Sequence, residues 1–203
     1  MSGGQIQLQH LFHRRWTIPV LAELHRARGS KLVTLVSRTG ASRKAIQETL
    51  VDLMKLGLVM RNPGYGHPLR PEYLLTTWAM QSGAAFVALH DVLLEKGLLD
   101  AGLKKWSMPV LAAAAGVAGG VRFSALRTGL EGITDRALTL ALKDLQQAGL
   151  VTRLVLDSYP PTTLYQATGE AGPVVAAIAG LLGEFPSPPA GTEGKARKRR
   201  ASG

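Results

Sequence analysis

The chain contains no cysteine, and this absence excludes several kinds of chemistry. Disulfides, thiolate nucleophiles, thiol redox switches and cysteine-ligated zinc sites all require sulfur ligands that the chain lacks. The five histidines, at positions 10, 13, 25, 67 and 90, do not show the paired spacing of a metal-binding helix. We therefore expect neither a metal ion nor a cofactor.

Long hydrophobic runs are also missing. No apolar stretch approaches the roughly 20 residues that a membrane span requires, and the opening sequence MSGGQIQLQH lacks the apolar core of a signal peptide. These absences predict a cytoplasmic protein without membrane association. A Gly-rich phosphate loop, a G-x-S-x-G element and a recognisable pair of carboxylates are absent too, so we do not expect an enzyme.

Negative charge is scarce relative to positive charge. The chain carries 24 Lys and Arg residues against 14 Asp and Glu residues, a net charge of +10, which favours a polyanionic partner. Residues 1–98 hold 12 basic and 6 acidic side chains, residues 99–185 hold 7 of each, and residues 186–203 hold 5 basic and 1 acidic. The cationic excess therefore lies in the first half and in the tail.

The same order of motifs occurs twice in the chain. The matching pairs are RRWTIPVLAEL (14–24) with KKWSMPVLAAA (104–114), ASRKAIQETLVDLMKLGLVMR (41–61) with ITDRALTLALKDLQQAGLVTR (133–153), and HPLRPEYLLT (67–76) with YPPTTLYQAT (159–168). The offset between matching residues is 90 to 92 positions. Such regularity indicates a duplicated structural unit.

Each copy begins with two predicted helices. The first follows a basic pair, and its tryptophan, Trp16 or Trp106, stands at the matching position in both copies, which suits an anchor in the core. A second, short helix is expected over residues 31–37 in the first copy and over 122–127 in the second.

The third helix of each copy has clear signals at both ends. Ser42 or Thr134 supplies a hydroxyl N-cap, apolar residues at i, i+4, i+7 spacing form a core stripe, and Gly57 or Gly149 ends the helix. An alternating strand, a Pro/Gly turn and a second strand follow. Three helices and a β-hairpin describe a winged helix-turn-helix, so the predicted fold is mainly α with small β-hairpins (α+β).

This pattern divides the chain into four predicted segments. They are a first winged-helix domain (1–77), a connecting and packing helix (78–98), a second winged-helix domain with a C-terminal helix (99–185), and a disordered basic tail (186–203). The packing helices, roughly 78–96 and 172–183, have apolar faces that one small unit cannot cover. We expect each to pack on the other within the chain, or to form a homodimer with a second chain.

Four segments of the second copy stand in the order KKWSMPVL, VRFSALRTGLEGIT, ALTLALKDLQQAGLVTR and YPPTTLYQATGEAG. They resemble the HxlR-type bacterial transcriptional regulators, and with the more diverged first copy the resemblance covers about residues 11–183. The resemblance implies a winged helix that binds DNA and dimerises through its terminal helices. Members of that family usually have one such domain, and many have a sensor cysteine, which this chain lacks.

In the first copy we predict DNA contact from the third helix, from the wing and from the arginine that stands just before the N-cap. A recognition helix presents polar side chains near its N-terminus to base edges in the major groove. The candidates are Arg38, Ser42, Arg43, Lys44, Gln47, Arg61, His67 and Arg70. The alternative is that these side chains only form a solvated surface.

The second copy has a less suitable helix for reading DNA. Asp135 stands where the first copy has Arg43, and Leu140 and Ala141 replace Glu48 and Thr49 on a face expected to be exposed. Weak contacts are predicted from Thr134, Arg136, Lys143 and Arg153. In the tail, phosphate contacts are predicted from Lys195, Arg197, Lys198, Arg199 and Arg200. The alternative is that these residues only make the tail soluble.

These observations favour a bacterial transcriptional regulator that binds double-stranded DNA. One alternative is a nucleoid-associated or DNA-repair-linked architectural protein with low sequence specificity, which the basic tail supports. Another is a tandem winged-helix module that binds a protein, which the exposed Leu140 and the neutral second half support.

Overall fold

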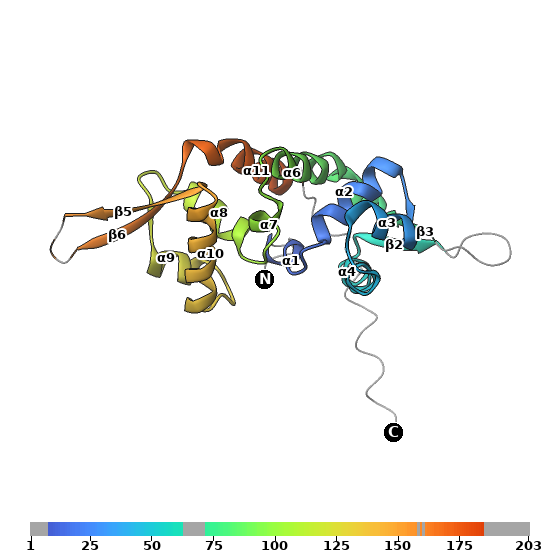
Figure 1. Ribbon diagram of the computed structural model, residues 1–203, viewed down its shortest axis with the longest axis horizontal. Coiled ribbons are helices and arrows are strands. Elements are labelled where there is room, and N and C mark those ends of the chain that lie inside the picture. The colour runs from blue at the N-terminus through green and yellow to red at the C-terminus, as the bar shows by residue number, and fades with distance from the viewer. Residues whose placement is uncertain (1–7, 63–71, 158, 160, 185–203) are drawn as a thin grey trace, which may run out of the picture.

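The computed structural model describes residues 8–62, 72–157, 159 and 161–184. The molecule is elongated, with its two halves side by side along the long axis and two helices, α6 and α11, lying across their junction (Figure 1). No helix in the described part of the chain has the length and apolar character needed to cross a membrane.

Both halves are built from short helices and one small sheet. The first half contains α1 (Leu8–Leu11), α2 (Thr17–Ala27), β1 (Ser30–Lys31), α3 (Leu32–Thr39), α4 (Arg43–Lys55), β2 (Val59–Asn62), β3 (Glu72–Leu75), α5 (Thr77–Gln81) and α6 (Gly83–Glu95). The second half contains α7 (Leu99–Gly102), α8 (Ser107–Ala115), β4 (Val121–Arg122), α9 (Phe123–Gly129), α10 (Asp135–Gln147), β5 (Val151–Leu156), β6 (Thr162–Ala167), the 3₁₀ turn η1 (Gly169–Ala171) and α11 (Gly172–Glu184). The mainly α fold with small antiparallel sheets is consistent with the predicted winged helix.

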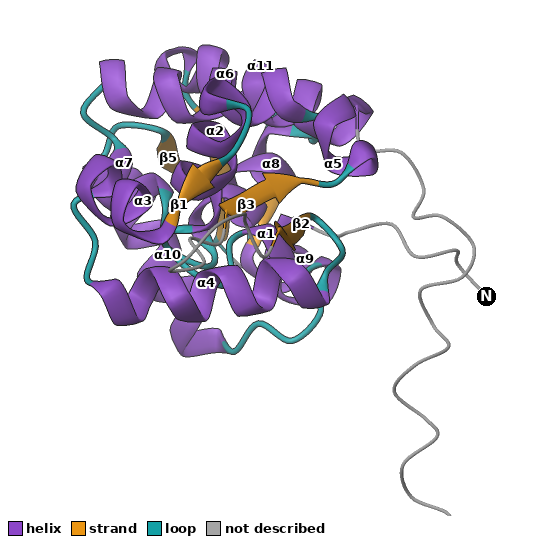
Figure 2. Cartoon of the chain, turned by 90° about the vertical axis from the view of Figure 1, so that its right-hand side faces the viewer, coloured by secondary structure: helices purple, strands orange, loops and turns teal. Residues whose placement is uncertain are grey.

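Each sheet has three antiparallel strands, in the orders β1-β3-β2 and β4-β6-β5. Val59 pairs with Leu75 in the first sheet, and Val151 pairs with Ala167 in the second. The sequence predicted only the hairpins. It missed β1 and β4 because two residues are too few to show the alternation of a strand. Figure 2 shows the first sheet in the middle of its half, with α6 above it and α4 below.

The ends of α4 and α10 confirm the predicted capping residues. The Ser42 and Thr134 side chains accept hydrogen bonds from the backbone N–H groups of Ala45 and Ala137, each at 3.2 Å. Such a cap satisfies one of the N–H groups that the first helical turn leaves without a partner. The chain then leaves both helices through glycines with φ of 71° at positions 57 and 149, a conformation that other residues rarely adopt.

The core is continuous through both halves. The buried stripe of α4 consists of Ile46, Leu50 and Leu53, and that of α10 consists of Leu138, Leu142 and Leu145. Trp16 and Trp106 are half-buried against this core, less enclosed than predicted. A cation covers each ring: Arg15 lies 5.5 Å from the Trp16 centroid, and Lys105 lies 5.2 Å from that of Trp106.

The helix predicted over 78–96 is broken at Ser82, where α5 ends and α6 begins. Gly83 follows the break, and a Cβ atom there would lie 1.9 Å from Nδ1 of His25 on α2. The glycine therefore allows α6 to pack closely on α2. Along its remaining length α6 packs on α11 (Figure 1), so the two packing helices cover each other within one chain.

Candidate nucleic-acid interface

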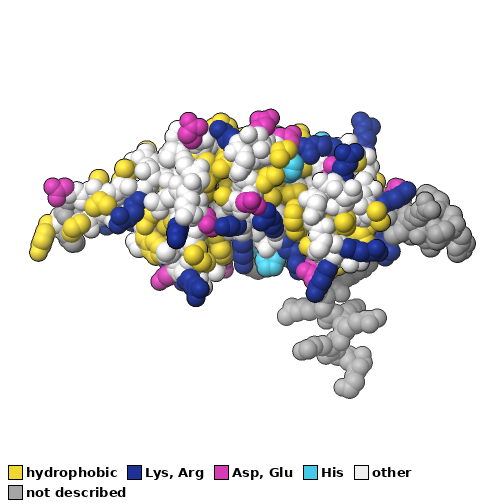
Figure 3. Space-filling view, viewed as in Figure 1, with side chains coloured by type: hydrophobic (Ala, Val, Ile, Leu, Met, Phe, Trp, Pro, Cys, Tyr) yellow, Lys and Arg dark blue, Asp and Glu magenta, His cyan; other side chains and the backbone are white. Residues whose placement is uncertain are grey.

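The first two turns of α4 present a polar and cationic surface. Ser42, Arg43, Lys44 and Gln47 are all exposed, and neither Arg43 nor Lys44 forms an ion pair with any described residue. The buried stripe of α4 faces the opposite way, so the fold directs these four side chains outward together. In Figure 3, Lys and Arg side chains are prominent on the half of the molecule that contains α2, α3 and α4.

The acidic residues of α4 are held by an arginine that precedes α2. The Arg14 guanidinium donates to Glu48 at 2.7 Å and also donates to Asp52. The hydrogen bond from Arg14 keeps the pKa of the Asp52 carboxyl below its usual range, although burial opposes the shift. The same pairing raises the pKa of Arg14. Glu48 lies on the solvent side of the helix, as expected, with its side chain 43% exposed and paired with Arg14.

Arg38 lies at the last turn of α3, next to the turn that leads into α4. Its side chain is 71% exposed, and its Nε lies 3.8 Å from the Glu23 carboxylate, a long and weak ion pair. Thr39 fixes the turn, since its hydroxyl donates to the Leu35 carbonyl at 2.7 Å and accepts from the Ala41 N–H at 3.3 Å. Arg38 is thus exposed beside the N-terminus of α4 and available to a phosphate.

The wing of the first half contributes Arg61, which is exposed on β2 opposite Tyr73. Two other wing candidates, His67 and Arg70, lie outside the described residues. So do the five tail candidates, Lys195, Arg197, Lys198, Arg199 and Arg200. Contacts from these seven residues remain sequence-based predictions.

The corresponding face of α10 differs in charge and polarity. Thr134, Arg136 and Lys143 are exposed, as predicted. Asp135 occupies the position of Arg43 and accepts a hydrogen bond from Nε of Arg127 at 2.7 Å, which partly offsets its charge. The first turn of α10 therefore presents a bound carboxylate where α4 presents a free guanidinium.

Two neighbouring positions of α10 differ in their burial. Leu140 is 53% exposed, as expected, but Ala141 is only 5% exposed, so its placement on the outer face was wrong. Ala141 lies three residues after the buried Leu138 and therefore joins the core stripe, as does its buried counterpart Thr49 in α4. Lys104 pairs with Asp144 at 2.8 Å, but Leu140 cannot supply the second carboxylate that Glu48 supplies to Arg14.

The second wing has little cationic character in its described part. Arg153 is exposed but donates to the Thr163 hydroxyl at 3.3 Å, across the hairpin. Beyond it, Val155 is 59% exposed, Leu156 is 45% exposed, and Tyr159 is fully exposed. Figure 3 shows apolar side chains at this end of the molecule.

Comparison with known proteins finds a similarity, and it lies in the second half. Residues 103–187 match the model of the HxlR-like helix-turn-helix family. This segment is therefore similar to the HxlR-like helix-turn-helix domains. The family comprises DNA-binding transcriptional regulators, so the match supports DNA binding and transcription regulation as the general activity. No curated protein matches the chain.

The HxlR-like match begins after the first half, whose α4 carries the more cationic surface. The family match and the charge distribution therefore point to different halves of the chain. Sequence reasoning also missed the contact of Arg14 with α4, although the i, i+4 spacing of Glu48 and Asp52 was a usable signal. The described residues contain no group of three or more His, Asp or Glu side chains that could hold a metal ion.

Proposed function

We propose that the chain is a transcriptional regulator made of two winged-helix domains, and that the first domain makes the principal contacts with duplex DNA. The observation that carries this proposal is the exposed, unpaired Arg43 and Lys44 at the start of α4, on a helix whose acidic residues are bound by Arg14. An Arg at such a position can donate two hydrogen bonds to guanine, and a Lys can bind phosphate.

We further propose that the two domains arose by duplication. The sheets have the same strand order, and the pairs Val59–Leu75 and Val151–Ala167 are separated by the same 92 positions that separate the sequence motifs. Only the second copy retains enough of the family pattern to match its model. Divergence of the first copy accounts for this difference.

The two domains would act together as the single-chain counterpart of a dimer. In Figure 1, α4 and α10 lie on the side of the molecule opposite α6 and α11, and the wings extend toward opposite ends. Because α6 and α11 already cover each other, a homodimer formed through these helices is not required. We propose that one chain binds DNA and that it does so in the cytoplasm, at the nucleoid.

The second domain would contribute weaker contacts, through Thr134, Arg136, Lys143 and Arg153. The bound Asp135 and the apolar Leu140 make its helix a poorer partner for phosphate. In addition to Arg43 and Lys44, the first domain would contact DNA through six further residues: Arg38, Ser42, Gln47, Arg61, His67 and Arg70. The proposal assigns no catalytic step to any of these residues.

A second candidate function is architectural binding with little sequence preference. The five basic residues of the tail favour it, because phosphate contacts increase affinity without reading sequence. Each engaged cation adds about 0.9 to the slope of log affinity against log salt, so removing residues 186–203 measures the contribution of the tail.

Selection of bound duplexes from a random pool distinguishes the two functions. A regulator should enrich a defined motif that survives competition by excess nonspecific DNA at fixed salt. An architectural protein should leave the pool without a motif while retaining salt-sensitive affinity. Absence of duplex binding at low salt would reject both functions and favour a protein-interaction module.

A further inference from the structure

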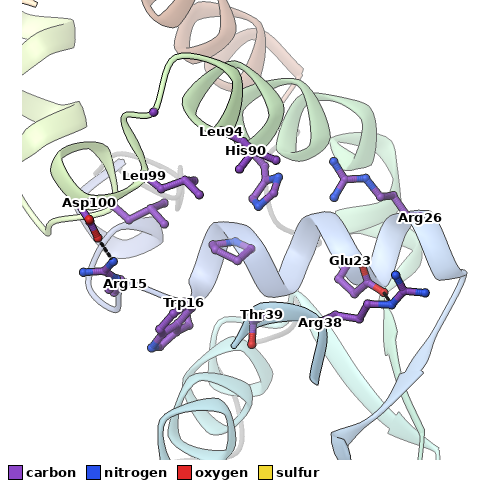
Figure 4. A pocket seen from close by; sticks show the side chains of 13 residues that line it. Arg15, Trp16, Glu23, Arg26, Arg38, Thr39, His90, Leu94, Leu99 and Asp100 are labelled. Carbon is purple, nitrogen blue, oxygen red and sulfur yellow. Dashed lines mark hydrogen bonds and ion pairs between the residues drawn. The ribbon is translucent and has the colours of Figure 1, made fainter. Parts of the chain in front are cut away.

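A cavity of about 470 Å³ lies between the first winged helix and the segment that leads to the second. Its walls come from α2, the end of α3, the end of α6 and the region of α7 (Figure 4). The volume falls within the range of about 300–1,000 Å³ that is usual for small-molecule sites. None of the proposed DNA contacts except Arg38 lines it.

One part of the cavity is apolar. Trp16, Pro19, Leu94, Leu99 and Leu103 contribute to its lining. Arg15 covers the Trp16 ring, and the ring remains half-buried. A flat hydrocarbon body would find both aromatic and aliphatic partners here.

Another part of the cavity is rich in hydrogen-bond donors. Arg15, Arg26 and Arg38 line it, and each has a single carboxylate partner among the described residues, respectively Asp100, Asp91 and Glu23. A guanidinium carries five N–H donors, so each arginine retains donors for a further acceptor. Arg38 is the most accessible, because its contact with Glu23 is long and its side chain is 71% exposed.

We propose that this cavity binds a small aromatic carboxylate that regulates the protein. The ring would lie against Trp16 and the leucines, and the carboxylate would take the free donors of Arg38, which lies at the other end of the cavity from Arg15 (Figure 4). The apolar wall favours an aromatic carboxylate over inorganic phosphate, because phosphate has no apolar surface to bury against it.

The position of the cavity indicates how such a ligand would act. Arg38 and Thr39 adjoin the turn that sets the start of α4, whereas Leu99 and Asp100 belong to the connection to the second half. A ligand that bridges the two walls would draw Arg38 away from a DNA phosphate and fix the turn. We therefore expect the carboxylate to weaken DNA binding. This effect rests on the proposed function, but the binding of the carboxylate to the cavity is independent of it.

Tryptophan fluorescence provides the test. Replacing Trp78 and Trp106 by Phe leaves Trp16 as the only reporter in the full chain. The probes are benzoate and phenylacetate, which do not emit where Trp does, each paired with its neutral carboxamide. We expect at least one acid to change the Trp16 emission saturably and to bind at least tenfold more tightly than its amide.

Matched variants locate the binding. Arg38→Ala should weaken the acid at least fivefold, and Arg38→Lys should restore part of the affinity. Arg122→Ala, which removes an exposed arginine outside the cavity, should have no effect. Thermal melting of each variant checks that it is folded. The proposal is overturned if no acid binds more tightly than its amide, or if a folded Arg38→Ala variant binds as well as the parent.

Titration of DNA in the presence of the acid tests the coupling separately. The account expects the acid that binds best to raise the Kd for DNA at least threefold. An unchanged Kd would reject the regulatory role. If the chain does not bind DNA even without acid, the proposed function fails, and the fluorescence titration alone decides on the ligand site.

Discussion

In the first half of the molecule, α4 opens with the exposed Arg43 and Lys44, and Arg14 binds both of its acidic residues. In the second half, α10 opens with Asp135 bound to Arg127, and it exposes Leu140 where α4 has Glu48. The buried stripes of the two helices are nevertheless alike. The comparison teaches that the core can be retained while the outer face of the same helix changes, so function must be argued from that face.

The strongest test of the shared core compares equivalent leucines. Leu50→Ala and Leu142→Ala should each lower the free energy of unfolding by about 2–5 kcal/mol, because both side chains are buried in a packed core. Urea unfolding followed by circular dichroism measures the loss. If one of the two substitutions left the free energy of unfolding almost unchanged, the two buried stripes would not be equivalent.

The difference between the outer faces should appear in DNA affinity. Arg43→Ala with Lys44→Ala should weaken duplex binding by about 1–3 kcal/mol, the usual value of a good base contact. Arg136→Ala with Lys143→Ala should have a much smaller effect, because these residues lie beside a bound carboxylate and an exposed leucine. Fluorescence anisotropy at fixed salt measures both.

Lys55→Ala is the control for loss of charge, since it removes an exposed cation from the far end of α4. If it weakens binding as much as the double variant, the N-terminal turn has no special role. Equal losses from the α4 and α10 double variants would mean that both domains read DNA.

Glycines in α6 and α11 sharpen the comparison of the packing helices. Gly83→Ala should destabilise the protein by about 1–3 kcal/mol, because the new methyl group would clash with His25 on α2. Gly180→Ala should stabilise it by about 0.5–1 kcal/mol, because no described atom lies within 4 Å of the added Cβ in the α11 position. Thermal unfolding of both variants should give shifts of opposite sign.

An effect similar in size to that of Gly180→Ala, but dependent on pH, is expected at Asp52. Since the pKa of Asp52 is lowered in the folded protein, its contribution to stability is complete above the unfolded value of about 4 and is lost as pH falls through the folded value. Asp52→Asn should cost on the order of 1 kcal/mol at pH 7. Unfolding curves of the variant and the parent should converge only when the pH falls below the lowered pKa of folded Asp52, and a constant difference would show that the charge of Asp52 is not responsible.

The features that sequence predicted are those with local causes. The caps at Ser42 and Thr134, the glycine ends of α4 and α10, and the buried stripes all follow from residues close together in the chain. The exposure of Arg43 and Lys44 follows from the same stripe, because the side chains opposite a buried face point outward.

The remaining features depend on contacts between distant residues. Arg14 reaches Glu48 across 34 positions, and Gly83 meets His25 across 58, so the sequence around each residue does not identify its partner. The cavity likewise combines residues from both sides of the connection, such as Arg15 and Asp100. Such sites become visible only when the fold has brought the segments together.

Photocrosslinking tests the central claim most directly. A photoreactive amino acid would be placed at Gln47 in one variant and at the matching, equally exposed Thr139 in another. With a duplex selected by the parent protein, the account predicts strong crosslinking from position 47 and weak crosslinking from position 139. Stronger crosslinking from position 139 would contradict it and assign the reading of DNA to the second domain.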